Sequence, residues 1–332
     1  MWQQSRSKGG VIVSTVLSVL LVTCSILIIF FRQQVTDQIT VWQFSPSAEI
    51  NTLVVRDGMS DYGKFLFYAS KPELDSPDKF NKFCSKVEDT SSVLGCYNNN
   101  QIYIYNITDT QLDGIREVTA AHEMLHAAYH RLGSDDKAKL DVLLEAEYEK
   151  LQNTKQFAEL IAFYARTEPG ERGNELHSII GTEIATIDPA LETYYKQYFS
   201  NRQSTVTLFN KYNGVFTALA DHAKVLSDEL SALSASITSR SVQYNLDVKT
   251  LNDDIAAFNN KSENGGFTSQ YQFSVQRSAL TARVTDLNTT RVSINSDTDK
   301  YNSILAEYNS IASQSSKLYD SVDSTLAPAP SV

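Results

Sequence analysis

Residues 112–133 read LDGIREVTAAHEMLHAAYHRLG, and this stretch decides the fold class. Its apolar residues recur at helical spacing and Gly133 is a natural stop, so the sequence predicts one helix over 112–132. His122 and His126 stand four residues apart, which puts both imidazoles on one face of that helix. Apolar residues in register with them indicate that this face points toward packed protein.

The same helix carries a motif with a specific chemistry. His122-Glu123-Met124-Leu125-His126 has the pattern H-E-x-x-H. Two histidines one turn apart can bind a single Zn²⁺, and the glutamate that follows the first is then beside the metal's water as a general base. A histidine on an apolar face is more often a satisfied core residue than a ligand. Two at this spacing with a glutamate between them are much rarer, so we favour a metal site.

A zinc peptidase needs a third protein ligand and one open position. His130 lies four residues beyond His126. On a straight helix, however, it is about 12 Å along the axis from His122, too far to share one ion. We therefore predict that His130 is a surface or packing residue. Better candidates stand in residues 174–183, NELHSIIGTE, which contain two glutamates and a further histidine.

The H-E-x-x-H helix followed by Glu175, with Ser178 three residues later, resembles the gluzincin group of zinc peptidases. In that group a second helix supplies a glutamate ligand, within E-x-x-S or N-E-x-x-small patterns. The resemblance covers only these two helices, and the gap after His126 is longer than in thermolysin-like members. It implies a Zn²⁺ ion held by both histidines and Glu175, with Glu183 as the rival ligand. It also implies that the small residue at 178 lets the two helices approach closely.

The resemblance further implies a zinc metalloendopeptidase. Zinc lowers the pKa of its bound water toward about 7 and polarises the scissile carbonyl. Glu123 would then pass the proton of the water to the leaving amine. A further donor is expected to stabilise the oxyanion. His177, Tyr164 and Tyr194 are candidates by chemistry alone, and the sequence does not rank them.

The N-terminal region reads as a membrane anchor. Residues 11–31 contain no charge, and 21 residues suffice to cross a hydrocarbon core of about 30 Å as a helix. Arg6 and Lys8 precede the run and only Arg32 follows it closely, so the positive-inside bias places residues 1–10 in the cytoplasm. A cleaved signal peptide would have a shorter apolar core and a small-residue cleavage site. We predict a single-pass cell-membrane protein with an extracytoplasmic catalytic domain.

Cysteine usage agrees with this orientation. Cys24 lies within the predicted span, which leaves Cys84 and Cys96 as a pair in the exported part. A disulfide between them would close a short loop, worth about 3 kcal/mol in an oxidising compartment. Two free buried thiols are the alternative, because sequence alone does not give the geometry.

The remaining chain divides into a connector, a domain, a helical hairpin and a tail. Residues 32–52 read as a juxtamembrane connector, and 53–200 as a mostly helical, zincin-like α+β metallopeptidase domain. Strands are predicted at 53–55, 65–68 and 101–105, and helices at 134–152, 156–166 and 189–199, with Asn174 capping the ligand helix.

A heptad pattern begins near residue 201. Leu219, Leu226 and Leu233 are seven residues apart, and Gly265-Gly266 separates this run from a second one. The sequence therefore predicts an antiparallel coiled-coil hairpin over 201–325, with arms of about 70 Å or more, and a disordered tail over 326–332. Such a hairpin is a spacer, a dimerisation arm or a protein-binding surface.

The charge balance limits the partners. The chain has 39 acidic and 29 basic residues, and its lysines and arginines form no cluster interleaved with aromatics, so nucleic acid is not an expected partner. We expect a peptide or protein substrate, the membrane, and a protein partner or a second copy along the coiled coil. The alternative to a membrane-anchored peptidase is an envelope scaffold that acts through its coiled coil, with an inert zincin domain.

Overall fold

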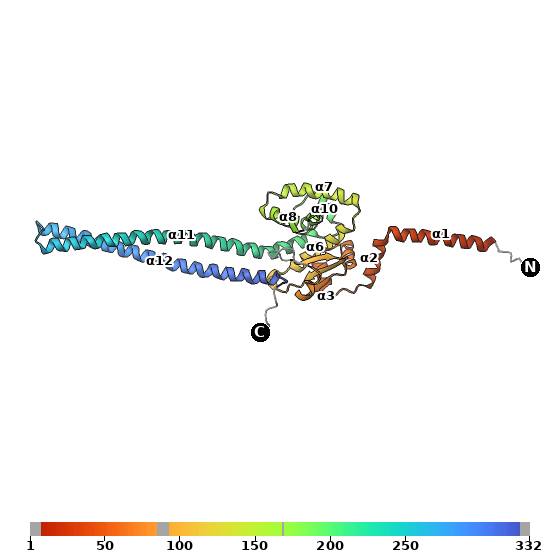
Figure 1. The fold of residues 1–332 in the computed structure, drawn as a ribbon, viewed down its shortest axis with the longest axis horizontal. Helices are drawn as coiled ribbons and strands as arrows, with labels where there is room; N and C mark the ends of the chain where they lie inside the picture. Colours follow the sequence, from red (N-terminus) through yellow and green to blue (C-terminus); the bar gives the residue numbers. More distant parts are fainter. Residues whose placement is uncertain (1–7, 85–92, 168, 326–332) are drawn as a thin grey trace, which may run out of the picture. The chain divides into compact units, whose positions relative to one another are not determined.

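The computed structural model describes residues 8–84, 93–167 and 169–325. The protein is α+β and mostly helical, with a small mixed sheet of three strands. It divides into two compact units, Met1–Val215 with Tyr319–Val332, and Phe216–Leu318 (Figure 1). Residues 1–7 of the predicted cytoplasmic tail and the whole predicted disordered tail, 326–332, lie outside the described residues.

Helices occupy the two places where the first strands were predicted. α3 (Ala48–Arg56) covers residues 53–55, and α4 (Asp61–Ala69) covers residues 65–68, so both strand predictions are wrong. Each helix begins at a serine, Ser47 or Ser60, whose hydroxyl accepts a hydrogen bond from the backbone N–H three residues on. The buried side chains of α3, Ile50, Leu53 and Val54, recur at helical spacing. The three apolar residues 53–55 are too few to show this period, so they were interpreted as a strand.

Two further helices precede α3. α1 (Lys8–Phe30) coincides with most of the predicted anchor, and α2 (Arg32–Gln43) occupies much of the predicted connector. Among the residues that the structure describes, no helix combines the length and the apolar character needed to cross a bilayer. The anchor therefore stays a prediction from the sequence.

The predicted connector packs onto the motif helix. Asp37 of α2 is buried and forms a bidentate ion pair with Arg131, which follows α6 (Ile115–His130) directly. The Nε–Oδ2 and Nη2–Oδ1 distances are 2.8 and 2.9 Å. Such a fork-to-fork pair fixes the orientation of α2 against the end of α6.

The sheet has the strand order β1-β3-β2, with β1 (Glu73–Asp75) parallel and β2 (Gly95–Asn98) antiparallel to β3 (Gln101–Tyr105). β3 confirms the strand predicted at 101–105. Asn99 and Asn100, both with positive φ, make the tight turn from β2 to β3. β2 is therefore an edge strand. A disulfide between Cys84 and Cys96 ties it to the chain that follows α5 (Pro77–Phe80), which confirms the predicted pairing.

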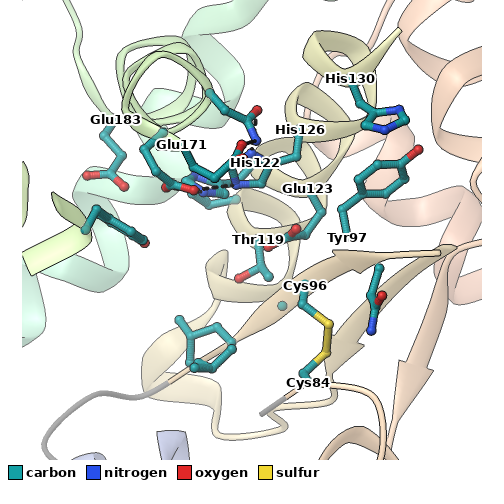
Figure 2. A pocket seen from close by; sticks show the side chains of 18 of the residues that line it. Cys84, Cys96, Tyr97, Thr119, His122, Glu123, His126, His130, Glu171 and Glu183 are labelled. Carbon is teal, nitrogen blue, oxygen red and sulfur yellow. Dashed lines mark hydrogen bonds and ion pairs between the residues drawn. A yellow bond between two sulfur atoms is a disulfide. The ribbon is translucent and has the colours of Figure 1, made fainter. Parts of the chain in front are cut away.

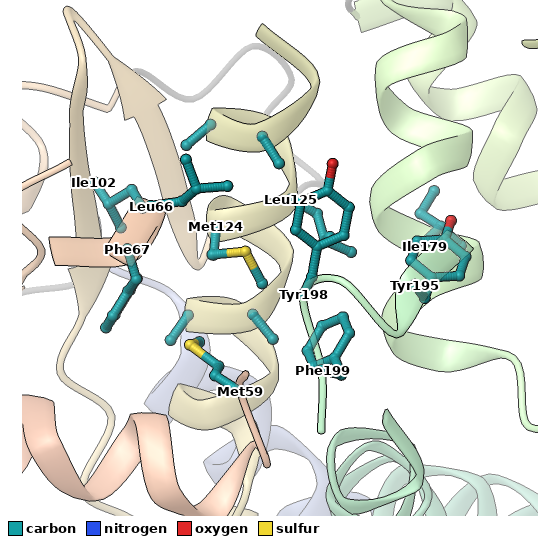
Figure 3. Packing of buried hydrophobic residues seen from close by; sticks show 14 of the residues in the cluster. Met59, Leu66, Phe67, Ile102, Met124, Leu125, Ile179, Tyr195, Tyr198 and Phe199 are labelled. Atoms are coloured by element: carbon teal, nitrogen blue, oxygen red, sulfur yellow. The ribbon is translucent and has the colours of Figure 1, made fainter. Parts of the chain in front are cut away.

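α6 forms the centre of the hydrophobic core (Figure 3). Met124 and Leu125 on this helix are fully buried, with Ile102 of β3 on one side and Ile179 of α9 on the other. The helices that follow confirm the predicted ones to within a few residues, except that α10 stops four residues early. They are α7 (Ser134–Leu151), α8 (Lys155–Thr167), α9 (Arg172–Glu183) and α10 (Pro189–Tyr195).

The predicted hairpin consists of α11 (Arg202–Glu263) and α12 (Gln270–Val322), and the second unit, Phe216–Leu318, contains the larger part of both helices. Leu226 of the predicted heptad run is buried, and so are Leu251 and Ile294 farther along the two arms. Arg240, a polar residue at a seam position, pairs with Asp297 on the opposite arm. At the tip, three phenylalanine rings meet with centroids 5.2 Å apart: Phe258, Phe267 and Phe273.

Candidate metal centre

α6 brings the two motif histidines together as predicted. The rings of His122 and His126 have centroids 4.7 Å apart and planes inclined by 78°, and both residues lie near Glu123 on α6 (Figure 2). Potential ligand atoms of His122, Glu123 and His126 all lie within 4.8 Å of one another. This group could hold a metal ion.

The carboxylate of Glu175, on α9, also lies within 4.8 Å of both imidazoles. Oε1 of Glu175 is 3.4 Å from Nε2 of His126, and Oε2 is 3.8 Å from Nε2 of His122. Zinc–nitrogen and zinc–oxygen bonds of about 2.1 Å place two donors on one tetrahedral ion about 3.4 Å apart. The 3.4 Å between His126 and Glu175 matches this separation, and the 3.8 Å between His122 and the other oxygen of Glu175 is slightly longer. Glu175 is 2% exposed. Burying a carboxylate costs free energy, and a bound cation would offset this cost.

Glu183 ends α9 and lines the same cavity. Burial raises the pKa of its carboxyl to about 7, while His122 lowers it and Glu175 raises it further. Glu183 is thus within electrostatic reach of the site. Among the described contacts, however, the carboxylate that lies within 4 Å of Nε2 of both histidines is that of Glu175.

Side chains on α9 orient His126 from behind. Its Nδ1 is 2.9 Å from Oδ1 of Asn174 and 3.2 Å from the hydroxyl of Ser178. An amide oxygen can only accept, so Nδ1 donates to Asn174 and the lone pair of Nε2 is left for a metal. The amide nitrogen of Asn174 donates in turn to Oε2 of Glu171 at 3.1 Å.

This role of Asn174 was missed in the sequence. We predicted Asn174 as the cap of the helix, but α9 begins at Arg172 with Glu171 at the cap position, so that prediction is wrong. One signal was present. Asn174 and Ser178 are four residues apart and therefore lie on the same helix face, the face that meets His126.

α9 approaches α6 closely because small residues face it. A Cβ atom added to Gly181 would lie 2.4 Å from Cδ1 of Leu125 and 2.8 Å from Cε1 of Tyr195, so this position accepts only glycine without rearrangement. Ser178 is one helical turn away on the same face. The close approach expected from Ser178 thus involves both residues.

The histidines border a cavity of about 610 Å³. The wall opposite α9 is the edge strand β2, and Gly95 in this strand lies directly against Glu123. A Cβ atom at Gly95 would be 2.8 Å from Oε1 of Glu123 and 2.6 Å from Cγ2 of Thr119. Glycine therefore lets the strand run beside the candidate general base.

The three candidate oxyanion donors are separated by the structure. Tyr164 of α8 lines the cavity, whereas His177 and Tyr194 are not among its lining residues. His177 is fully buried, and its Nε2 is 3.1 Å from the hydroxyl of Tyr194. Burial lowers the pKa of His177 to about 3, so its imidazole is neutral. His177 and Tyr194 thus pack together away from the residues that line the cavity, and their role as oxyanion donors stays a prediction.

His130 also lines the cavity, with its ring edge-on to Tyr97 at 5.8 Å. It is outside the group that could share a metal ion, as predicted.

Comparisons with known proteins assign no family to this chain: no protein-family model, curated protein or solved structure matches it. Its function is therefore inferred from the residues of the site and their geometry.

Proposed function

We propose that the chain is a zinc metallopeptidase that hydrolyses peptide bonds in exported proteins or peptides. His122, His126 and Glu175 would hold the ion, and Glu123 would be the general base. The observation that supports this most directly is the meeting of both Nε2 atoms with one carboxylate, at 3.4 and 3.8 Å. Their positions on two separate helices make an accidental match to zinc geometry improbable.

Each residue of the proposed active site would then have one role in the reaction. The ion supplies Lewis-acid polarisation of the peptide carbonyl when it is bound. Glu123, on the β2 side of the cavity, accepts a proton from the attacking water and returns it to the leaving amine. Tyr164 lines the cavity, and its hydroxyl would donate a hydrogen bond to the developing oxyanion.

The edge strand would hold the substrate. In the sheet β2 pairs with β3 along one side only, and residues 94–98 are among those that line the cavity. An extended peptide can add to such an edge through main-chain hydrogen bonds. This would place a peptide bond between Glu123 and the two histidines.

Metal content and proteolysis test the proposal together. We expect one zinc ion per wild-type chain, lost in His122→Ala and in His126→Ala, measured by mass spectrometry of the metal. Glu123→Gln is expected to keep the zinc and lose chelator-sensitive proteolysis, because it removes only the base. Glu175→Ala is expected to weaken zinc binding more than Glu183→Ala. A folded wild type that binds no zinc would support the scaffold alternative instead.

The location of the site is a separate part of the proposal. The uncharged run over 11–31 would anchor the chain with its catalytic domain outside the cytoplasm, where the Cys84–Cys96 disulfide is stable. Protease added to intact cells is expected to degrade the domain, and an alkaline wash to leave the chain in the membrane fraction. A chain protected from protease, or released by the wash, would contradict this location.

A further inference from the structure

β2 runs along the helix that carries the H-E-x-x-H motif. A Cβ atom at Gly95 would meet side chains of Thr119 and Glu123, so this face of the strand is turned toward α6. Tyr97 is two residues further on and therefore lies on the same face. Its ring is edge-on to His130 at the end of the helix (Figure 2). The strand is thus in contact with α6 near the candidate general base and again at the last turn.

A single guanidinium group joins Tyr97 to α6. Nη1 of Arg131 donates to the hydroxyl of Tyr97 at 3.1 Å and to the carbonyl of Ala127 at 2.9 Å. Nε and Nη2 donate to the two carboxylate oxygens of Asp37 on α2, at 2.8 and 2.9 Å. The side chains of Arg131 and Asp37 are only 7% and 6% exposed. Hydrogen bonds to a charged group that water scarcely reaches are strong, so together they fix the orientation of the guanidinium.

The planar shape of this group is what makes the link directional. Two parallel hydrogen bonds to Asp37 set the plane of the guanidinium, and this plane decides where Nη1 points. The hydroxyl of Tyr97 in turn donates to Oδ1 of Asn100, in the turn between β2 and β3, at 3.0 Å. The described residues that line the cavity include Tyr97 but not Arg131. Any effect of Arg131 on the site is therefore transmitted through the strand.

We propose that Arg131 is a positioning residue for substrate binding, which holds β2 in place beside the H-E-x-x-H helix through Tyr97. This inference rests on the proposed function, in which an extended peptide adds to the edge of β2. A strand that is already fixed loses less conformational freedom when the peptide binds, so binding is tighter. Asp37 acts one step further away, because it orients Arg131. α2 would then be part of the peptidase domain rather than a connector outside it.

Steady-state kinetics of the zinc-loaded, full-length protein test the inference, with fluorescein-labelled casein as the probe. Tyr97→Phe removes one hydroxyl and keeps the ring. We expect its KM to rise about 3- to 10-fold, the effect of one lost hydrogen bond, while kcat stays within about twofold and zinc content is unchanged. Arg131→Lys keeps the charge beside Asp37 but not the planar fork, so the same split between KM and kcat is expected.

Two comparisons assign the effect to the contact between Arg131 and Tyr97. Asn100→Gly removes the other hydrogen bond of the Tyr97 hydroxyl and suits the positive φ at this position, so its KM is expected to stay within about twofold of the wild-type value. The double variant of Tyr97→Phe and Arg131→Lys is expected to have the KM of either single variant, because both remove the same contact. An unchanged KM in Tyr97→Phe, or an equal rise in Asn100→Gly, would overturn the inference.

Amide hydrogen exchange separates this inference from the proposed function, because it needs no substrate. Residues 95–98 are expected to exchange faster in Tyr97→Phe and in Arg131→Lys than in the wild type. If the wild type cleaves casein but both variants keep its exchange rates and its KM, the positioning role is refuted and the peptidase stands. A zinc-loaded wild type that cleaves no casein would refute the proposed function, and the exchange rates would still decide whether Arg131 holds the strand.

Discussion

At the scale of single residues, the candidate metal site depends on side chains that are not themselves candidate ligands. Asn174 fixes which nitrogen of His126 carries the proton, and therefore which nitrogen can bind metal. The peptide neighbour of Asn174 is Glu175, so one turn of α9 supplies a candidate ligand and the partner that orients another. A small rotation of this turn would disturb both contacts at once.

Asn174→Ala is accordingly expected to lower zinc affinity about 10- to 100-fold, because His126 loses the acceptor for its Nδ1 proton. Competition with a fluorescent chelator measures the change. Asn174→Asp keeps an acceptor oxygen at the same place and is expected to retain most of the affinity. Equal losses in the two variants would contradict the role given to this contact.

A second prediction concerns Asp57, which is fully buried. Burial, with the nearby charge of Glu117, raises its pKa well above the ordinary value, while Thr205 and Arg56 oppose the rise. A raised carboxyl pKa favours the protonated form in the folded state. The corresponding stability is therefore fully present below pH 4 and is lost as the pH rises.

Asp57→Asn removes this dependence, because an amide does not ionise. We expect its free energy of unfolding at pH 7 to exceed that of the wild type by about 1–3 kcal/mol. The difference is expected to shrink toward zero at pH 4 and below, in urea denaturation at a series of pH values. A difference independent of pH would show that Asp57 is not protonated in the folded protein.

At the scale of elements, the site lies between a helix that the sequence predicts well and a strand that it does not. The H-E-x-x-H helix is predicted by its apolar period and its motif, both of which are local. β2 has only four residues, Gly95–Asn98, without alternation of apolar and polar side chains. It exists because the Asn99-Asn100 turn folds it back on β3, and this pairing is a non-local effect.

The other failures have similar causes. The sequences of α3 and α4 each contain a short apolar run that is also typical of a strand. The serine cap at the start of each is the local sequence signal that favours a helix. His177 has the chemistry of a hydrogen-bond donor, but its position behind α9 follows from the packing of four tyrosines around its ring. Residue type and spacing thus predicted the metal group, whereas the orientation of its neighbours required the tertiary structure.

Gly95→Ala tests the contact between β2 and the motif helix. The added methyl group would displace Glu123 or the strand, so we expect hydrolysis to fall about 10- to 100-fold while zinc content is unchanged. Gly133→Ala is the matched control, because a Cβ atom there meets nothing within 4 Å and its φ of −67° suits alanine. Loss of zinc from Gly95→Ala would point to a wider disruption of the site.

At the scale of the whole molecule, the chain joins two compact units with different kinds of stability. The first has a large core around α6 that includes residues from many elements, and a smaller cluster of Phe80, Cys84 and Tyr103. The hairpin is held by a narrow seam and by pairs between its arms, such as Lys300–Glu229 and Arg283–Asp254. Substitutions in the hairpin seam are therefore expected to change the stability of that unit and to leave the candidate metal site unchanged.

Leu251→Ala is expected to destabilise the hairpin by about 2–5 kcal/mol without changing zinc affinity, because Leu251 is 5% exposed within this unit. Thermal unfolding followed by circular dichroism, together with metal analysis, measures both. Leu246→Ala, at a position 56% exposed, is expected to change stability by less than about 0.5 kcal/mol. A parallel loss of zinc in Leu251→Ala would show that the units are coupled.

The division of the metal group between α6 and α9 has a consequence for biosynthesis. On the ribosome the second of the two histidines, His126, is made 49 residues before Glu175, the candidate third ligand. Before Glu175 is translated, a divalent ion could bind only to His122, Glu123 and His126 of this site. Firm loading must therefore wait until α9 has been translated and has docked on its partner helix, so metallation would report that this part of the protein is complete.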